Sequence, residues 1–117
     1  MIPIPAFLAR LARVGLVFCA ILAFIIAILP SAPGPENYND KVIHASTFFV
    51  LAGLAGTGWR RSRAFKLFIA LTMFGGFIEI MQGLDIIGRD ADWFDLMADM
   101  GGAALGLIVS RILTRPI

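Results

Sequence analysis

Residues 14–29 read VGLVFCAILAFIIAIL, an apolar run without a single charged side chain. Three more apolar runs follow at 42–59, 67–84 and 96–110. A helix that crosses a bilayer needs about 20 residues, within a range of about 17 to 25, so residues at the membrane interface must complete each span. The sequence therefore predicts four transmembrane helices, near residues 10–30, 41–60, 64–84 and 92–113.

The composition excludes most soluble proteins. Of the 117 residues, 59% are hydrophobic and 15% are charged, whereas a soluble domain carries roughly 25% charged residues. A soluble chain of this length could not bury so much apolar surface. The single cysteine, Cys19, excludes an intrachain disulfide and is expected to be a small lipid-facing or core residue. The net charge is only +2 and the basic residues are scattered, so we expect no nucleic-acid partner.

The charges divide between the predicted loops. Basic residues without acidic neighbours lie before the first predicted helix, between the second and third, and after the fourth, whereas acidic residues dominate the other two loops. By the positive-inside rule, both termini and the loop at 60–66 lie in the cytoplasm. We therefore expect an all-α membrane protein, a single domain over residues 1–117. It is predicted to be a four-transmembrane-helix bundle with both termini cytoplasmic.

A signal peptide is the competing interpretation of the first segment, because a basic start precedes an apolar run that ends near Ser31 and Ala32. The run is longer than a usual signal core, and Pro33 would follow a cut after Ala32. A retained first helix is therefore the favoured interpretation.

Several polar side chains lie within the predicted spans or at their outer ends. An ionisable residue in a span is costly and is by default a functional-site hypothesis. Within each helix these residues have helical spacing, so they share one face, and the simplest arrangement points the three faces at one another. The candidate ligand-binding residues are Lys41, His44, Glu79, Gln82, Arg89, Asp95 and Asp99, and Asp92 extends the stripe of the last two.

Each of these residues also has a purely structural interpretation. Glu79 could be neutral and hydrogen-bonded between helices, and His44 could be a packing residue. Lys41 could extend its ammonium group to the interface, Arg89 could be an interfacial anchor, and Asp95 suits a helix N-terminus. The structural interpretation is weaker for the residues taken together than for each one alone. Acidic, basic and amide groups that converge in one leaflet are costly unless they pair or bind something.

Gly102 and Gly106 form a GxxxG pattern in the fourth predicted helix. Small residues at this spacing let helices approach closely. The pattern predicts close helix packing and is only weak evidence for a dimer.

The order of these polar residues resembles the VanZ-like family of small bacterial membrane proteins. The resemblance covers residues 40–106 and a leading helix. It rests on Asp40-Lys41 followed by His44, on ExxQ at 79–82, on Arg89, and on DxxxDxxGxxxG at 95–106. One departure is Asp99, which stands where the family pattern usually has asparagine and adds an ionisable group.

The resemblance implies an inner-membrane protein with a role in the cell envelope or in antibiotic resistance. The family takes its name from a protein linked to resistance to teicoplanin, a glycopeptide antibiotic that acts on cell-wall precursors. The resemblance supplies no reaction.

Three functional hypotheses follow. In the first, the site binds or handles an envelope lipid or a lipid-linked cell-wall precursor, with Lys41 and Arg89 on a phosphate headgroup. The second is an intramembrane headgroup hydrolase or transferase, with His44, Glu79 and Asp95 as catalytic candidates. The third is a structural or accessory subunit with a protein partner or a second copy of the chain, whose polar residues only lock the bundle. We expect no cofactor and no metal, since a set such as His44, Glu79 and Asp95 lacks a diagnostic spacing.

Overall fold

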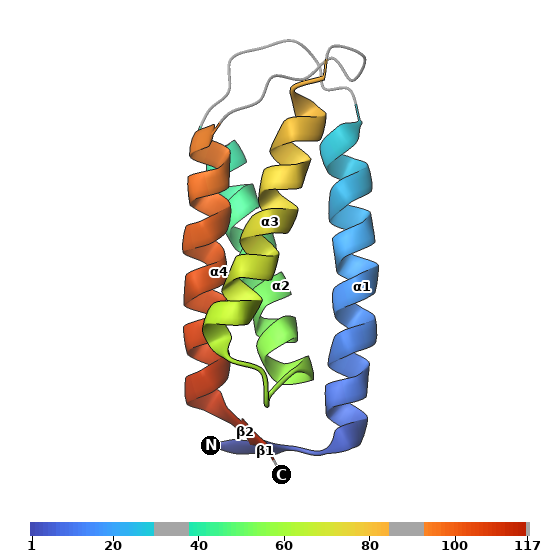
Figure 1. Ribbon diagram of the computed structural model, residues 1–117, viewed down its shortest axis with the longest axis vertical. Coiled ribbons are helices and arrows are strands. Elements are labelled where there is room, and N and C mark those ends of the chain that lie inside the picture. Colours follow the sequence, from blue (N-terminus) through green and yellow to red (C-terminus); the bar gives the residue numbers. More distant parts are fainter. Residues whose placement is uncertain (30–37, 85–92, 117) are drawn as a thin grey trace.

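The computed structural model describes residues 1–29, 38–84 and 93–116, and it shows a bundle of helices that lie side by side (Figure 1). All four predicted helices are confirmed, with ends that differ by a few residues. The largest difference is at the start of α1, where Pro5 occupies the N-cap position with an extended backbone. The helices are α1 (Ala6–Ile28), α2 (Tyr38–Gly58), α3 (Ala64–Gln82) and α4 (Trp93–Leu113).

Three of the helices, α1, α3 and α4, are long and apolar enough to cross a membrane. This indicates a membrane protein. The 21 residues of α2 make about 32 Å of helix, but α2 is not among the helices that reach this hydropathy. It carries small and polar side chains because it contacts all three other helices. The fourth span therefore stays a prediction.

The interface between α2 and α4 is the most extensive in the bundle. Gly102 and Gly106 of α4 lie directly against the backbone of α2. A Cβ added at Gly102 would clash with the carbonyl of Ala45, and one added at Gly106 would clash with the carbonyl of Phe49. Close helix packing by the GxxxG pattern is thereby confirmed within this chain. The core beside it comprises Phe48, Leu51, Ala52, Ala55, Leu71, Ile78, Ala103 and Leu107.

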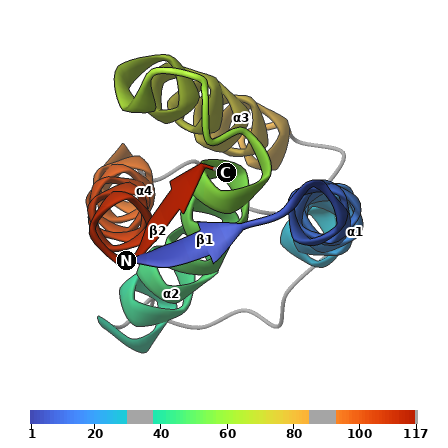
Figure 2. The same ribbon diagram turned by 90° about the horizontal axis from the view of Figure 1, so that it is seen from below.

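Helix α1 lies at the edge of the bundle, beside α2 and α3 (Figure 2). Ala12 is its one buried residue, and many of its large apolar side chains are exposed. Exposed apolar side chains of this kind suit contact with lipid chains. A cavity lies along the C-terminal half of α1.

Two short strands join the ends of the chain. β1 (Ile2–Ile4) pairs in parallel with β2 (Thr114–Pro116), with Ile2 opposite Thr114. The sequence did not predict them, because each has three residues and contains proline. Both termini and the turn between α2 and α3 lie at one end of the bundle (Figure 1). The cytoplasmic location of this end stays a prediction.

Arginine side chains at this end cap α2. Arg13 Nε donates to the Gly58 carbonyl at 2.6 Å, and its guanidinium lies 5.3 Å from the centre of the Trp59 ring. Arg111 donates to the carbonyls of Arg60 and Ser62, at 2.5 and 2.7 Å. Carbonyls at a helix C-terminus have no partner within the helix. The arginines that predict the topology therefore also hold α1 and α4 against the end of α2.

Candidate functional site

The predicted site residues gather at the end of the bundle opposite the termini. Glu79 and Asp99 are fully buried, and Gln82 and Asp95 are nearly so. Arg89 and Asp92 lie outside the described residues. The described members are Lys41 and His44 from the start of α2, Glu79 and Gln82 from the end of α3, and Asp95 and Asp99 from the start of α4.

Lys41 forms an ion pair with Asp95 between α2 and α4. The Lys41 Nζ donates to Asp95 Oδ1 at 2.5 Å, with the lysine side chain 32% exposed and the aspartate side chain 4% exposed. Asp95 lies in the first turn of α4, where a carboxylate is also favoured by the helix dipole. Lys41 is therefore bound to a partner in the bundle, and its partly exposed side chain borders the cluster.

His44 lies between the two aspartates of α4. Its Nδ1 is 2.9 Å from Asp99 Oδ1, within hydrogen-bond distance, and its Nε2 is 3.6 Å from Asp95 Oδ2. The side chain of His44 is 13% exposed, whereas that of Asp99 is fully buried. A carboxylate next to one ring nitrogen fixes the orientation of the imidazole. Asp99 thus positions His44, and His44 is the more accessible of the two.

Glu79 completes the cluster from α3. Atoms of His44, Glu79 and Asp99 lie within 4.8 Å of one another, and each could bind a metal ion. The sequence had placed Asp95 in such a set, whereas the structure puts Asp99 there. Two of the three residues, His44 and Asp99, are already within hydrogen-bond distance of each other.

Gly75 of α3 makes room for the buried aspartate. A Cβ added at Gly75 would lie 2.9 Å from Asp99 Oδ2 and 3.3 Å from the Phe48 ring. The sequence did not connect this glycine with the site. A side chain at position 75 would press on Asp99.

Gln82 differs from the other members. Its Nε2 donates to the Ala27 carbonyl at the end of α1, at 2.8 Å. Gln82 therefore ties α1 to α3, and it lies at the boundary between the polar cluster and a cavity.

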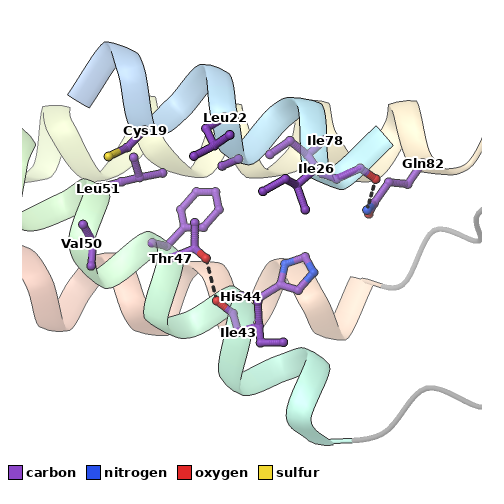
Figure 3. A pocket seen from close by; sticks show the side chains of 13 residues that line it. Cys19, Leu22, Ile26, Ile43, His44, Thr47, Val50, Leu51, Ile78 and Gln82 are labelled. Atoms are coloured by element: carbon purple, nitrogen blue, oxygen red, sulfur yellow. Dashed lines mark hydrogen bonds between the residues drawn. The ribbon is translucent and has the colours of Figure 1, made fainter. Parts of the chain in front are cut away.

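The cavity has a volume of about 480 Å³ and lies between α1, α2 and α3. Its walls are mostly apolar; the polar side chains among its lining residues are His44, Thr47 and Gln82. Figure 3 shows His44 and Gln82 toward one end and Cys19, Val50 and Leu51 toward the other. The sequence missed this cavity, because apolar residues that face a groove and those that face lipid look the same in α1. The remaining lining residues are Leu22, Ala23, Ile26, Ala27, Ile43, Phe48 and Ile78.

Comparisons of the chain with family models, with curated proteins and with solved structures find no match in any of the three. The VanZ-like resemblance therefore stays a prediction from the residues. The class supported by the fold is a small helical membrane protein with a buried polar cluster at one end.

Proposed function

We propose that this protein binds the polar headgroup of a membrane lipid or of a lipid-linked precursor at its polar cluster. One observation carries the proposal: three acidic residues, Glu79, Asp95 and Asp99, are buried in a bundle with three apolar helices. Ionisable groups at such a position are costly and mark sites that bind or transfer something. A polar ligand that hydrogen-bonds to the cluster would explain why so many converge.

The cluster has an order that suits a headgroup. Its donors, Lys41 and His44, are the partly exposed members, whereas the carboxylates behind them are buried. Lys41 and His44 would meet phosphate, carbonyl or hydroxyl oxygens of the headgroup first. Asp95 and Asp99 would hold these two donors in place, since each lies against at least one of them.

The proposed location is the outer face of the bacterial cytoplasmic membrane. It is supported by the separation of charge along the bundle, because exposed basic side chains gather at the end opposite the cluster and the positive-inside rule puts that end in the cytoplasm. The VanZ-like resemblance adds lipid-linked cell-wall precursors to the candidate ligands. A role in glycopeptide resistance belongs to the same proposal.

Native mass spectrometry of the protein purified in mild detergent tests headgroup binding. We expect a defined lipid adduct on the wild type that is lost in Glu79→Gln and in Arg89→Ala. Arg115→Ala is the matched control for Arg89→Ala, because it removes an exposed arginine from the end of the bundle opposite the cluster. It should retain the adduct. Circular dichroism and thermal unfolding establish that each variant is folded.

Two results would count against headgroup binding. If folded Glu79→Gln and Arg89→Ala keep the adduct, the lipid binds elsewhere. If both variants lose the fold and no specific adduct is present on the wild type, the cluster only locks the bundle. That second result would favour a structural or accessory subunit.

An intramembrane headgroup hydrolase or transferase is the second candidate function. The hydrogen bond between His44 and Asp99 favours it, because a carboxylate that orients an imidazole prepares it to act as a general base. His44 also borders the cavity, so its ring is within reach of a bound ligand. Under this hypothesis, His44→Gln would retain the lipid adduct and abolish product formation from a radiolabelled envelope lipid.

A further inference from the structure

We infer that the cavity along α1 holds the hydrocarbon chain of a membrane lipid whose headgroup lies at the polar cluster. This inference rests on the proposed function and extends it, because it names the ligand as an amphiphile bound by both of its parts. The cavity runs between α1, α2 and α3, and His44 belongs to both the cavity and the cluster. One ligand can therefore contact both.

The shape and lining of the cavity fit a chain with one polar end. Apolar side chains make most of its wall, and the polar side chains His44 and Gln82 lie toward one end (Figure 3). Thr47 does not interrupt the apolar part, because its hydroxyl donates to the Ile43 carbonyl of its own helix at 2.8 Å. A lipid placed here would have its chain against apolar walls and its polar part against His44 and Gln82.

The position in the bundle also fits a lipid. The α1 residues that line the cavity lie between Cys19 and Ala27, within a helix that is apolar enough to cross a membrane. These residues span about 12 Å along the helix, compared with about 15 Å for the hydrocarbon of one leaflet. Because α1 is parallel to the long axis of the bundle (Figure 1), the cavity follows the direction of lipid chains in a bilayer.

A helix from another protein is a poorer occupant. A helix with its side chains is about 10 to 12 Å in diameter, whereas a hydrocarbon chain is much thinner. The cavity volume of about 480 Å³ lies in the usual range of about 300 to 1,000 Å³ for small-molecule sites. A single hydrocarbon chain is therefore the better match.

Photocrosslinking with a fatty acid that carries a diazirine near the end of its chain tests this inference. Cells that express the protein incorporate the fatty acid into their own lipids, so no headgroup has to be chosen in advance. After irradiation, labelled peptides of the purified protein are mapped by mass spectrometry. We expect labels concentrated in residues 19–27 and 43–51, which line the cavity.

Ala23→Phe is the decisive variant, because Ala23 lines the cavity and a benzyl side chain would fill it. Ala70→Phe is its matched control, since Ala70 is exposed on α3 and lies outside the cavity lining. We expect Ala23→Phe to lose the labels in both segments and Ala70→Phe to keep them. Ala23→Leu, a smaller change, replaces Ala23→Phe if that variant fails to fold.

The inference is overturned if wild-type labels are spread evenly over the exposed apolar faces of α1, α3 and α4. It is also overturned if folded Ala23→Phe or Ala23→Leu keeps the labels of residues 19–27. These results are distinguishable from a failure of headgroup binding. If headgroup binding fails, folded Glu79→Gln keeps its lipid adduct in native mass spectrometry, whatever the crosslinks show.

Discussion

His44 is the residue at which the parts of the site meet. Its Nδ1 lies 2.9 Å from Asp99 Oδ1, its Nε2 lies 3.6 Å from Asp95 Oδ2, and its ring lines the cavity. A ligand in the cavity would therefore meet the polar cluster at this ring.

The first prediction concerns Asp99, where the VanZ-like pattern usually has asparagine. Asp99→Asn should keep the fold, because an amide oxygen can still accept a hydrogen bond from His44 Nδ1. Asp99→Leu removes that acceptor in a fully buried position and should lower the free energy of unfolding by about 1 to 3 kcal/mol. Thermal unfolding in detergent measures both variants. Equal destabilisation by asparagine and leucine would show that the negative charge itself is required.

The second prediction concerns metal ions. The atoms of His44, Glu79 and Asp99 that could bind an ion lie within 4.8 Å of one another, but two of these residues are already joined by a hydrogen bond. Lipid binding should therefore survive EDTA treatment without change. The lipid adduct in native mass spectrometry, recorded with and without EDTA and then after addition of Mn²⁺ or Zn²⁺, is the measurement. An adduct that disappears with EDTA and returns with one of these ions would contradict the prediction.

Helical spacing predicted much of the site, but not its pairings. The periodicity placed Lys41 with His44 on one face and Asp95 with Asp99 on another, and the structure brings these two faces together. The pairing of Lys41 with Asp95 and of His44 with Asp99 depends on how far each helix is rotated and shifted against its neighbour. That offset is set by Gly102 and Gly106 against the α2 backbone, a contact between residues far apart in sequence.

At the scale of the elements, the approach of α4 to α2 decides whether the site exists. The backbone of α4 comes so close to α2 that Gly102 has no space for a side chain beside Ala45. This contact holds the first turns of α2 and α4 together, and Lys41, His44, Asp95 and Asp99 lie on those turns.

The third prediction follows from this contact. Gly102→Ala should destabilise the bundle by about 1 to 3 kcal/mol, because overpacking forces the helices apart. Gly101→Ala is the matched control, since an added Cβ there meets nothing within 4 Å, and it should leave the stability almost unchanged. Thermal unfolding and folded yield in detergent compare the two. Similar losses in both variants would mean that glycine is needed for another reason than the close contact.

The helices themselves were predictable because long apolar runs are a strong signal. The cavity was not predictable, since it depends on how α1 packs against its neighbours. Apolar side chains are expected on α1 whether they line a cavity or contact lipid. The strands β1 and β2 were not predictable either, because three residues carry too little pattern. Helix α2 was predicted as a span but is less apolar than the other three helices. Because it contacts all three of them, fewer of its side chains need to be apolar.

At the scale of the whole molecule, the two ends of the bundle differ in chemistry. One end has the paired termini and the arginines that bind carbonyls at the end of α2 and in the turn after it. The other end has the polar cluster with its buried carboxylates. From this difference between the ends, the positive-inside rule predicts an orientation in the membrane.

The fourth prediction tests that orientation by cysteine accessibility in whole cells. In a Cys19→Ser background, Arg61→Cys, in the turn between α2 and α3, should react with a membrane-impermeant maleimide only after permeabilisation. Gly34→Cys should react in intact cells, because it lies in the loop predicted to be outside. The opposite pattern would invert the orientation, and reaction of both cysteines in intact cells would contradict a membrane span between them.

The pairing of β1 with β2 has a consequence for how the protein is made. β1 is synthesised near the start of the chain, but its partner exists only after residues 114–116 have left the ribosome. Contacts between such distant segments form slowly. During translation α1 is therefore made before its strand β1 has a partner. The contact between β1 and β2 can form only after α4 and residues 114–116 have been synthesised, so it is a late step of biogenesis.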